Sequence, residues 1–288
     1  MFKEVLIKLS VIKVAFVICV MLAASSCSDA NKNVAESLFV QARDLYDNQR
    51  YEESIKMLDS LKNNYKDNID LLKKVLHLRV LNQEGLVKKE ITTNDSLISE
   101  LELENQELSK EFKYIKHKDM VEGYYIHKNI ADKAGDDNRT TIEPRIDEGD
   151  MFYIVSYMKG VNVKHTSVSL VVPSAGEVTT STVPYDKSRN YRYNSDGVSY
   201  ESITFTNQEC DTLGQFVVEN VKSNFKLIFK GTKQHSVNLE PIIVKAIAQT
   251  YRYAINKKSG KSAIKKRMFL EQKLQLAQKQ IEQTKTIE

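Results

Sequence analysis

The sequence lacks several features that mark common classes of protein. It contains no tryptophan, which weakens the case for a sugar-binding surface. It also has no nucleophile elbow, phosphate-binding glycine loop, zinc-protease histidine pair or EF-hand pattern. Its five histidines are scattered without the spacing of metal ligands. We therefore expect no metal, no cofactor and no enzymatic activity, with a hydrolase of unrecognised site as one alternative.

The chain also lacks an excess of charge of either sign. Its formal net charge is +4, and residues 1–26 hold three lysines and one glutamate. Without those residues, 39 basic and 37 acidic side chains remain. A nearly neutral chain of this kind offers no general attraction to nucleic acid, so we expect no nucleic-acid partner.

The first 26 residues have the three parts of a secretion signal. Basic residues Lys3, Lys8 and Lys13 precede an apolar run over residues 14–24, and Ser25 and Ser26 follow it. The apolar run is shorter than the roughly 20 residues that span a bilayer. We expect cleavage after residue 26; the alternative is an uncleaved signal anchor.

Small residues before Cys27, followed by a polar tether over residues 27–33, resemble the lipobox of bacterial lipoproteins. The chain departs from that family at Ala24, where leucine is preferred. The resemblance implies that Cys27 becomes the first mature residue and carries acyl chains such as palmitate. Because two or more acyl chains give stable anchoring, it also implies a permanent tether to a Gram-negative envelope membrane, expected to be the outer one. The leaflet stays open.

Cysteine is scarce once Cys19 and Cys27 are assigned to the signal and the lipid. Only Cys210 is left, so the exported chain has no internal disulfide and depends on burial for its stability. We expect Cys210 to be a small buried hydrophobe.

Residues 34–87 read as a helical module. Apolar residues recur at helical spacing up to a break at 48–50, and a second helix opens at Tyr51. Segment 34–68 resembles a single tetratricopeptide repeat, with Tyr51, Glu53, Ile55 and Leu58 at signature positions. It departs from that family at Gln41, Ser54 and Lys66. A generic helical hairpin is the alternative interpretation.

Two later segments have the pattern of a coiled coil. Apolar residues alternate at spacings of three and four over residues 88–117, and less regularly over 261–284. The first segment is acidic and the second, within 261–288, is basic, so we expect an antiparallel arm that joins them from a junction near His117 and Lys261. A homodimeric coiled coil, with Asn94 and Asn105 setting the register, and a lipid-binding role for the basic stretch are the alternatives.

Residues 118–240 are rich in strand patterns. Seven alternating segments separated by turn signals predict an antiparallel β-sandwich or jelly roll; they are residues 151–157, 167–172, 177–182, 199–205, 215–218, 225–230 and 236–239. Pro241 then opens a helix over 241–260, which should end at a hinge near Ser259 and Gly260. The expected fold class is therefore α+β, with the β domain inserted at the tip of a helical arm.

A few residues are candidates for a functional role. Tyr191, Arg192 and Tyr193 would put two rings on one face of a strand with the arginine opposite. The alternative is that these tyrosines only reflect sheet propensity. His127 is the histidine that we single out. Three tripeptides resemble a short acceptor motif for O-glycosylation, at Ser60, Ser96 and Thr212.

These observations predict a lipid-anchored envelope protein that binds or scaffolds an envelope protein partner, as a monomer or a coiled-coil homodimer. A glycan-binding accessory lipoprotein, using the tyrosine-rich sheet, is the first alternative.

Overall fold

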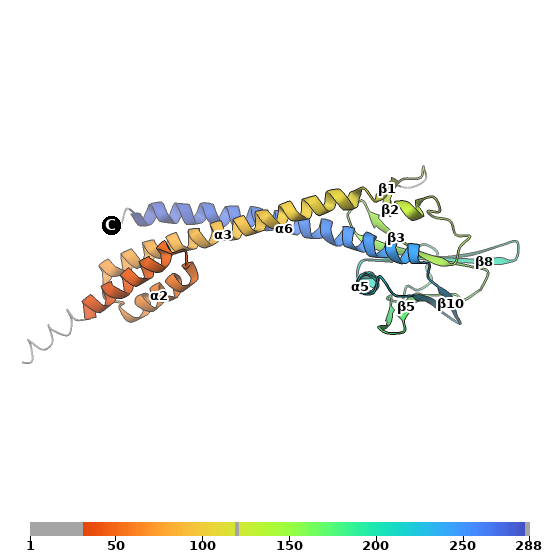
Figure 1. The fold of residues 1–288 in the computed structure, drawn as a ribbon, viewed down its shortest axis with the longest axis horizontal. Helices are drawn as coiled ribbons and strands as arrows, with labels where there is room; N and C mark the ends of the chain where they lie inside the picture. The colour runs from red at the N-terminus through yellow and green to blue at the C-terminus, as the bar shows by residue number, and fades with distance from the viewer. Residues whose placement is uncertain (1–30, 119–120, 286–288) are drawn as a thin grey trace, which may run out of the picture. The chain divides into compact units, whose positions relative to one another are not determined.

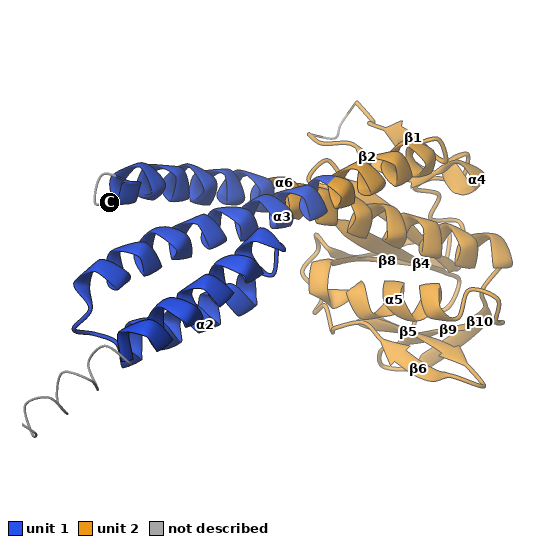
Figure 2. Cartoon of the chain, turned by 60° about the vertical axis from the view of Figure 1, so that its left-hand side comes forward, with its two compact units in different colours: residues 1–95, 265–288 blue, residues 96–264 orange. Residues whose placement is uncertain are grey.

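The chain is an α+β protein, described by a computed structural model over residues 31–118 and 121–285 (Figure 1). The predicted signal peptide over residues 1–26 and Cys27 lie outside the described residues. The chain divides into two compact units, one of residues 1–95 with 265–288 and one of residues 96–264 (Figure 2). We call them unit 1 and unit 2 and describe each by itself.

Unit 1 contains the predicted helical hairpin. Residues 31–47 are helical, a turn follows at 48–49, and α2 (Tyr51–Asn64) begins at the expected tyrosine. Ser54, buried in the hairpin, donates its hydroxyl hydrogen bond to the carbonyl of Ala42 at 2.7 Å. The ring of Tyr51 lies against Gly85, where a side chain would overlap it. The close approach of Tyr51 therefore requires glycine at position 85.

Two long helices contribute to both units: α3 (Ile69–Ser109) and α6 (Pro241–Lys285). In unit 1 they run antiparallel, because His77 contacts Thr284 at 2.8 Å while Arg267 contacts Asp95 at 2.6 Å. In unit 2, Asn256 donates to Glu104 at 2.5 Å. The direction agrees with the predicted pairing, but the register differs from it by about five helical turns.

The described part of unit 2 contains ten strands in two antiparallel sheets. One sheet has the order β1-β2-β3-β4-β8-β7 and the other β10-β9-β5-β6. The strands are β1 (Phe112–Ile115), β2 (Tyr124–His127), β3 (Thr141–Asp147), β4 (Phe152–Lys159), β5 (Ser167–Val172), β6 (Gly176–Thr179), β7 (Asn190–Ser195), β8 (Val198–Thr206), β9 (Lys226–Lys230) and β10 (Gln234–Asn238). Short helices α4 (Lys128–Ala131) and α5 (Asp211–Glu219), with the 3₁₀ turn η1 (Asn207–Glu209), complete it.

Both sheets of unit 2 share one apolar core with α5 and the first half of α6. Ile154 and Phe205 enter it from the first sheet and Leu170 and Phe229 from the second, all with 0 % of their surface exposed. From α6, Tyr251 packs edge-on against Phe152, with ring centroids 5.2 Å apart. The long helix thus belongs to the core of unit 2.

Three predicted boundaries are wrong. The helix expected over 88–117 ends at Ser109, because Phe112 and Ile115 belong to β1, which pairs with β2. The hinge expected near Ser259 and Gly260 is absent, since α6 continues unbroken to Lys285. Residues 215–218, expected as a strand, lie in α5, whose apolar residues are buried at helical spacing.

No helix within residues 31–118 and 121–285 combines the length and the apolar character that crossing a membrane requires.

Candidate functional site

Three tyrosine rings line one face of the edge of the six-stranded sheet. Tyr191 and Tyr193 project from β7, and Tyr200 lies directly opposite Tyr193 on β8. The rings of Tyr193 and Tyr200 are stacked, with centroids 4.7 Å apart and planes 4° apart. Tyr191 lies 5.9 Å from Tyr193 and has 47 % of its surface exposed. We call these three residues the tyrosine face.

A loop between α4 and β3 supports the tyrosine face. Tyr193 donates its phenol hydrogen bond to Asp137 at 2.5 Å, and this bond is the main reason why the pKa of Tyr193 rises to about 12. Asn138 accepts from Tyr200 at 3.5 Å and from the Lys159 ammonium at 3.1 Å. These bonds hold the two rings in fixed positions and keep the phenol of Tyr193 protonated.

The sequence-based expectation for Tyr191, Arg192 and Tyr193 is confirmed in its geometry. Arg192 extends away from the tyrosine face, where its guanidinium lies 4.8 Å from the ring centre of Tyr185. It also donates to the backbone carbonyl of His165 at 2.9 Å. Alternation along β7 therefore separates the two rings from the arginine, as the pleat of a strand requires.

Ordered aromatic rings at a protein surface can bind flat or apolar groups of another molecule. Offset or parallel rings offer flat apolar surfaces edged by hydroxyl groups, which suit the side chains of a protein partner or the apolar face of a sugar ring. Nothing in this arrangement activates a nucleophile or transfers a proton. The tyrosine face is therefore a candidate contact surface.

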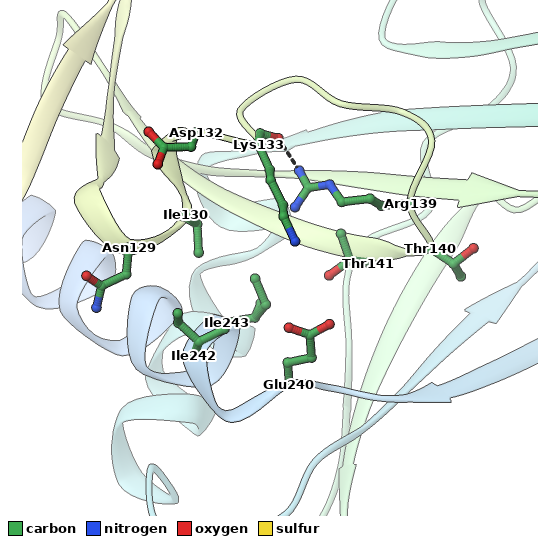
Figure 3. Close-up of a pocket in the computed structure, with 10 residues that line it drawn as sticks. All are labelled: Asn129, Ile130, Asp132, Lys133, Arg139, Thr140, Thr141, Glu240, Ile242 and Ile243. Atoms are coloured by element: carbon green, nitrogen blue, oxygen red, sulfur yellow. Dashed lines mark hydrogen bonds between the residues drawn. The ribbon is translucent and has the colours of Figure 1, made fainter.

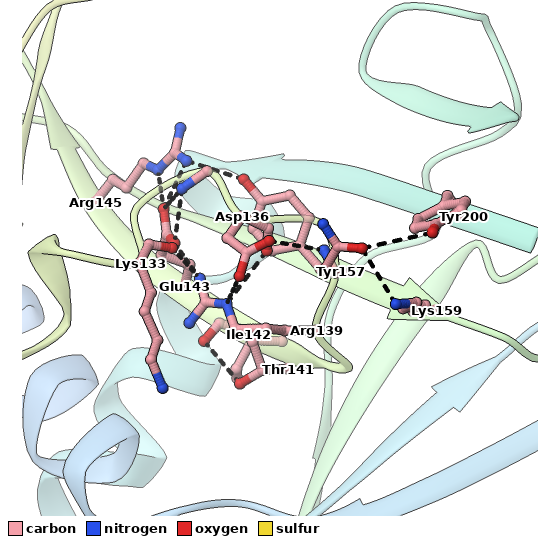
Figure 4. A network of polar contacts seen from close by, with 12 residues as sticks. Lys133, Asp136, Arg139, Thr141, Ile142, Glu143, Arg145, Tyr157, Lys159 and Tyr200 are labelled. Atoms are coloured by element: carbon pink, nitrogen blue, oxygen red, sulfur yellow. Dashed lines mark hydrogen bonds and ion pairs between the residues drawn. The ribbon is translucent and has the colours of Figure 1, made fainter. Parts of the chain in front are cut away.

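A buried ionic network holds the supporting loop in place (Figure 4). Glu143, 1 % exposed, bonds Arg145 at 2.6 Å and Arg139 at 2.9 Å. Arg139 in turn donates to the carbonyls of Lys133 and Asp136. Burial is the largest single effect and opposes the charge of Arg145, but the combined attraction of Glu143 and the neighbouring tyrosines outweighs it, so the pKa of Arg145 is raised. The network ties residues 133–139 to β3, and so fixes Asp137 and Asn138 beside the tyrosines.

His127 is buried and bonded to neighbouring residues of the fold. It is fully buried, and its Nδ1 accepts from the backbone N–H of Asn129, which leaves the proton on Nε2 to donate to Gln249 at 2.6 Å. Burial, the largest cause, lowers the pKa of this imidazole. His127 therefore caps α4 and joins it to α6 in the neutral form.

The three candidate O-glycosylation residues all lie in helices. Ser60 is on α2, Ser96 on α3 and Thr212 on α5, each with an exposed side chain.

Cys210 is fully buried, and burial raises the pKa of its thiol, so that it stays protonated. Cys27 lies outside the described residues.

Sequence reasoning missed a hydrogen-bonded chain of Ser156, His165 and Glu201. His165 lies 2.8 Å from the Ser156 hydroxyl and 2.7 Å from the Glu201 carboxylate, an order that resembles a catalytic triad. All three side chains are buried, and Ser156 and His165 have no exposed surface. Residues from β4, β8 and the loop between β4 and β5 meet here through pairing, so no local motif announces them.

The surroundings of Ser156, His165 and Glu201 suit a structural role, in which these side chains hold a loop in place. Glu201 also accepts the backbone N–H groups of Lys164 and His165. Burial, the largest single effect, raises the pKa of Glu201, but these bonds and the one from His165 together lower it below its usual value. Burial also lowers the pKa of His165. A carboxylate and a neutral imidazole thus hold the loop around residue 165 against β8.

A pocket of about 450 Å³ lies near the start of α6 (Figure 3). Lys133 and Arg139 line it together with Asp132 and Glu240, so its charges are of both signs. Arg139 is already bonded to Glu143. The pocket offers no set of converging groups of one kind, and we assign no ligand to it.

Comparisons with known proteins add no family. Among the described residues, no three histidine, cysteine or acidic side chains are placed to hold a metal ion. No protein-family model, no curated protein and no solved structure matches the chain.

Proposed function

We propose that the mature chain is a lipid-anchored envelope protein that acts by binding rather than by catalysis. Its tether is the acylated Cys27, in the outer membrane, and its binding surface is the tyrosine face of unit 2. In this proposal the two sheets act as a sandwich-like platform, and the antiparallel α3 and α6 act as a coiled-coil arm that carries it.

The observation that supports the binding role is the ordered exposure of Tyr191 and Tyr193. Rings that serve only the core are buried, as Tyr124 is at 1 %. Tyr191 instead keeps 47 % of its surface exposed beside a stacked pair, and a loop bonded to the phenol of Tyr193 fixes that pair. Aromatic residues held rigid at the surface are typical anchors of protein interfaces, because little side-chain entropy is lost on binding. The proposed partner is an envelope protein.

Glycan binding is the second candidate, favoured by the parallel stack of Tyr193 on Tyr200, whose flat surface suits a sugar ring. For a hydrolase, the chain of Ser156, His165 and Glu201 has the order of a catalytic triad, but Ser156 and His165 are fully buried and out of reach of a substrate. We therefore place it last.

Pull-down from solubilised envelope membranes, with the double variant Tyr191→Ala/Tyr193→Ala beside wild type, tests the binding role. We expect one stoichiometric protein with wild type and a loss of at least tenfold with the variant. Tyr185→Ala is the matched control, because Tyr185 has a similar exposed fraction of 46 % but contacts Arg192, which extends away from the tyrosine face. Equal capture by all three proteins would exclude the tyrosine face.

Metabolic labelling with an alkyne fatty acid tests the tether. Wild type should carry label and fractionate with the membrane, and Cys27→Ala should lose the label. An unlabelled wild-type protein held in the membrane would instead indicate that residues 1–26 remain as a signal anchor.

A further inference from the structure

The edge strand β7 has backbone groups that no neighbouring strand uses. Within the described residues, β8 is the only strand that pairs with it. The backbone N–H of Thr204 donates to Arg189, which makes that pair a hydrogen-bonded one. Because such pairs alternate in an antiparallel ladder, Tyr191 and Tyr193 also direct their backbone groups toward β8.

The turn between the two strands confirms this assignment. Asp196 and Gly197 have φ angles of 51° and 78°, as a two-residue type I′ hairpin turn requires, so Ser195 and Val198 close the hairpin as a hydrogen-bonded pair. The backbone groups of Asn190, Arg192 and Asn194 therefore point away from β8. The N–H of Asn190 is bonded to Asp186, which leaves Arg192 and Asn194 with both backbone groups directed outward.

From this geometry we propose that the partner binds as an extended peptide segment that adds a strand to the outer edge of β7. This inference rests on the proposed binding role of the tyrosine face and names the chemistry of the partner. The N–H and C=O groups of Arg192 and Asn194 supply the ladder, as in other cases of strand addition. In an antiparallel arrangement, Tyr191 and Tyr193 then occupy non-hydrogen-bonded positions, where cross-strand side chains approach most closely.

The side chains around β7 favour this occupant. Sheet edges are commonly protected by lysine, proline or bulges, but β7 has no proline, and its one charged residue, Arg192, turns away to bond His165. The other sheet ends in the edge strand β10, whose exposed side chains are all polar: Gln234, Ser236 and Asn238. It therefore offers no apolar surface beside its edge. The tyrosines next to the open edge thus select a peptide with apolar or aromatic side chains at alternate positions.

A proline substitution separates strand addition from simple stacking. Asn194→Pro removes an outward N–H and leaves the bonds to β8 in place, because proline is tolerated on an edge strand when its nitrogen faces solvent. Ser236→Pro is the matched control on β10, where the N–H of Leu239 bonded to Phe225 shows that residue 236 also points outward. Asn194→Ala controls for loss of the side chain.

The probe is a displayed library of linear 12-residue peptides, selected on the mature chain, with a glycan array run in parallel. We expect enriched peptides with alternating apolar residues, whose affinity, measured by fluorescence anisotropy, falls at least tenfold in Asn194→Pro. Affinity should be unchanged in Ser236→Pro and Asn194→Ala, and thermal melting should show that all variants are folded.

Other results overturn the inference. Binding that Tyr191→Ala/Tyr193→Ala abolishes but Asn194→Pro leaves intact would mean that the tyrosine face binds without strand addition, so the proposed function stands alone. Binding to glycans only would favour the second candidate. Failure to enrich any peptide and to bind any glycan would remove both strand addition and the binding role.

Discussion

At the scale of single residues, the ion pair of Glu143 and Arg145 shows how charge is used inside unit 2. Glu143 is 1 % exposed and Arg145 7 %, and the Arg145 guanidinium also lies 3.9 Å from the ring centre of Tyr124. A buried pair of this kind is stable only while both members are present, because each desolvated charge depends on the other. Arg139 extends the same network to the loop that supports the tyrosine face.

We predict that Glu143→Gln lowers the free energy of unfolding by about 3–5 kcal/mol, since it leaves Arg145 buried without a counter-charge. Urea unfolding measures this. Glu122→Gln, at an exposed position, is the control and should change stability by less than about 0.5 kcal/mol. An equally small effect at Glu143 would show that water solvates Arg145 in the folded protein, and that the ionic network is not shielded from solvent.

A second prediction concerns pH. Burial lowers the pKa of His127 and His165 below the usual 6.5, so the unfolded chain takes up protons near that pH while the folded chain does not. Stability should therefore fall as pH drops from about 6.5 toward 5, by up to about 1.4 kcal/mol per pH unit for each histidine. His127→Gln should reduce this slope, and His117→Gln, exposed, should leave it unchanged. A flat profile in wild type would contradict the buried neutral assignment.

At the scale of elements, α6 shows how packing overrides a local signal. Ser259 and Gly260 have weak helix propensity, and glycine costs about 1 kcal/mol in a helix. Yet α6 continues through them, because buried Tyr253 and Ala254 precede them and buried Ala263 follows. A side chain added at Gly260 would meet nothing within 4 Å.

We therefore predict that Gly260→Ala raises the free energy of unfolding by about 0.5–1 kcal/mol. Gly214→Ala on α5 is the contrasting variant, because its new methyl group would overlap the ring of Tyr251 and should destabilise unit 2. Thermal melting of the two variants checks both signs. Destabilisation by Gly260→Ala would mean that the helix is interrupted there in solution.

At the scale of the whole molecule, distant parts of the chain build each unit. Unit 1 combines residues before Asp95 with residues after Lys265, and Leu270, Ala277 and Ile281 of α6 are buried in it. The core of unit 2 is complete without residues 265–288.

Deletion of residues 265–288 should therefore expose the part of α3 in unit 1 and leave the core of unit 2 protected. Hydrogen–deuterium exchange would show faster exchange over residues 69–95 and unchanged protection of β4 and β8. Deletion of residues 286–288 alone is the control. Faster exchange throughout unit 2 would show that its stability depends on unit 1.

Much of this architecture follows from local pattern. The start of α2 at Tyr51, the start of α6 at Pro241 and the alternation of Tyr191, Arg192 and Tyr193 were predictable, because turn chemistry and side-chain period act over a few residues. The α+β class follows from the same periodicities, and the opposite charges of the two helical segments predict the antiparallel direction of α3 and α6.

The tertiary structure alone decided the rest. Phe112 and Ile115 fit a helical period equally well, and only pairing with β2 made them a strand. Tyr200 joined the tyrosine face, and Ser156, His165 and Glu201 met in a buried chain, through sheet register. Register is a long-range property, set by burying one face of each strand. The sequence determined which residues could form the surface, and the packing of distant strands determined which of them meet.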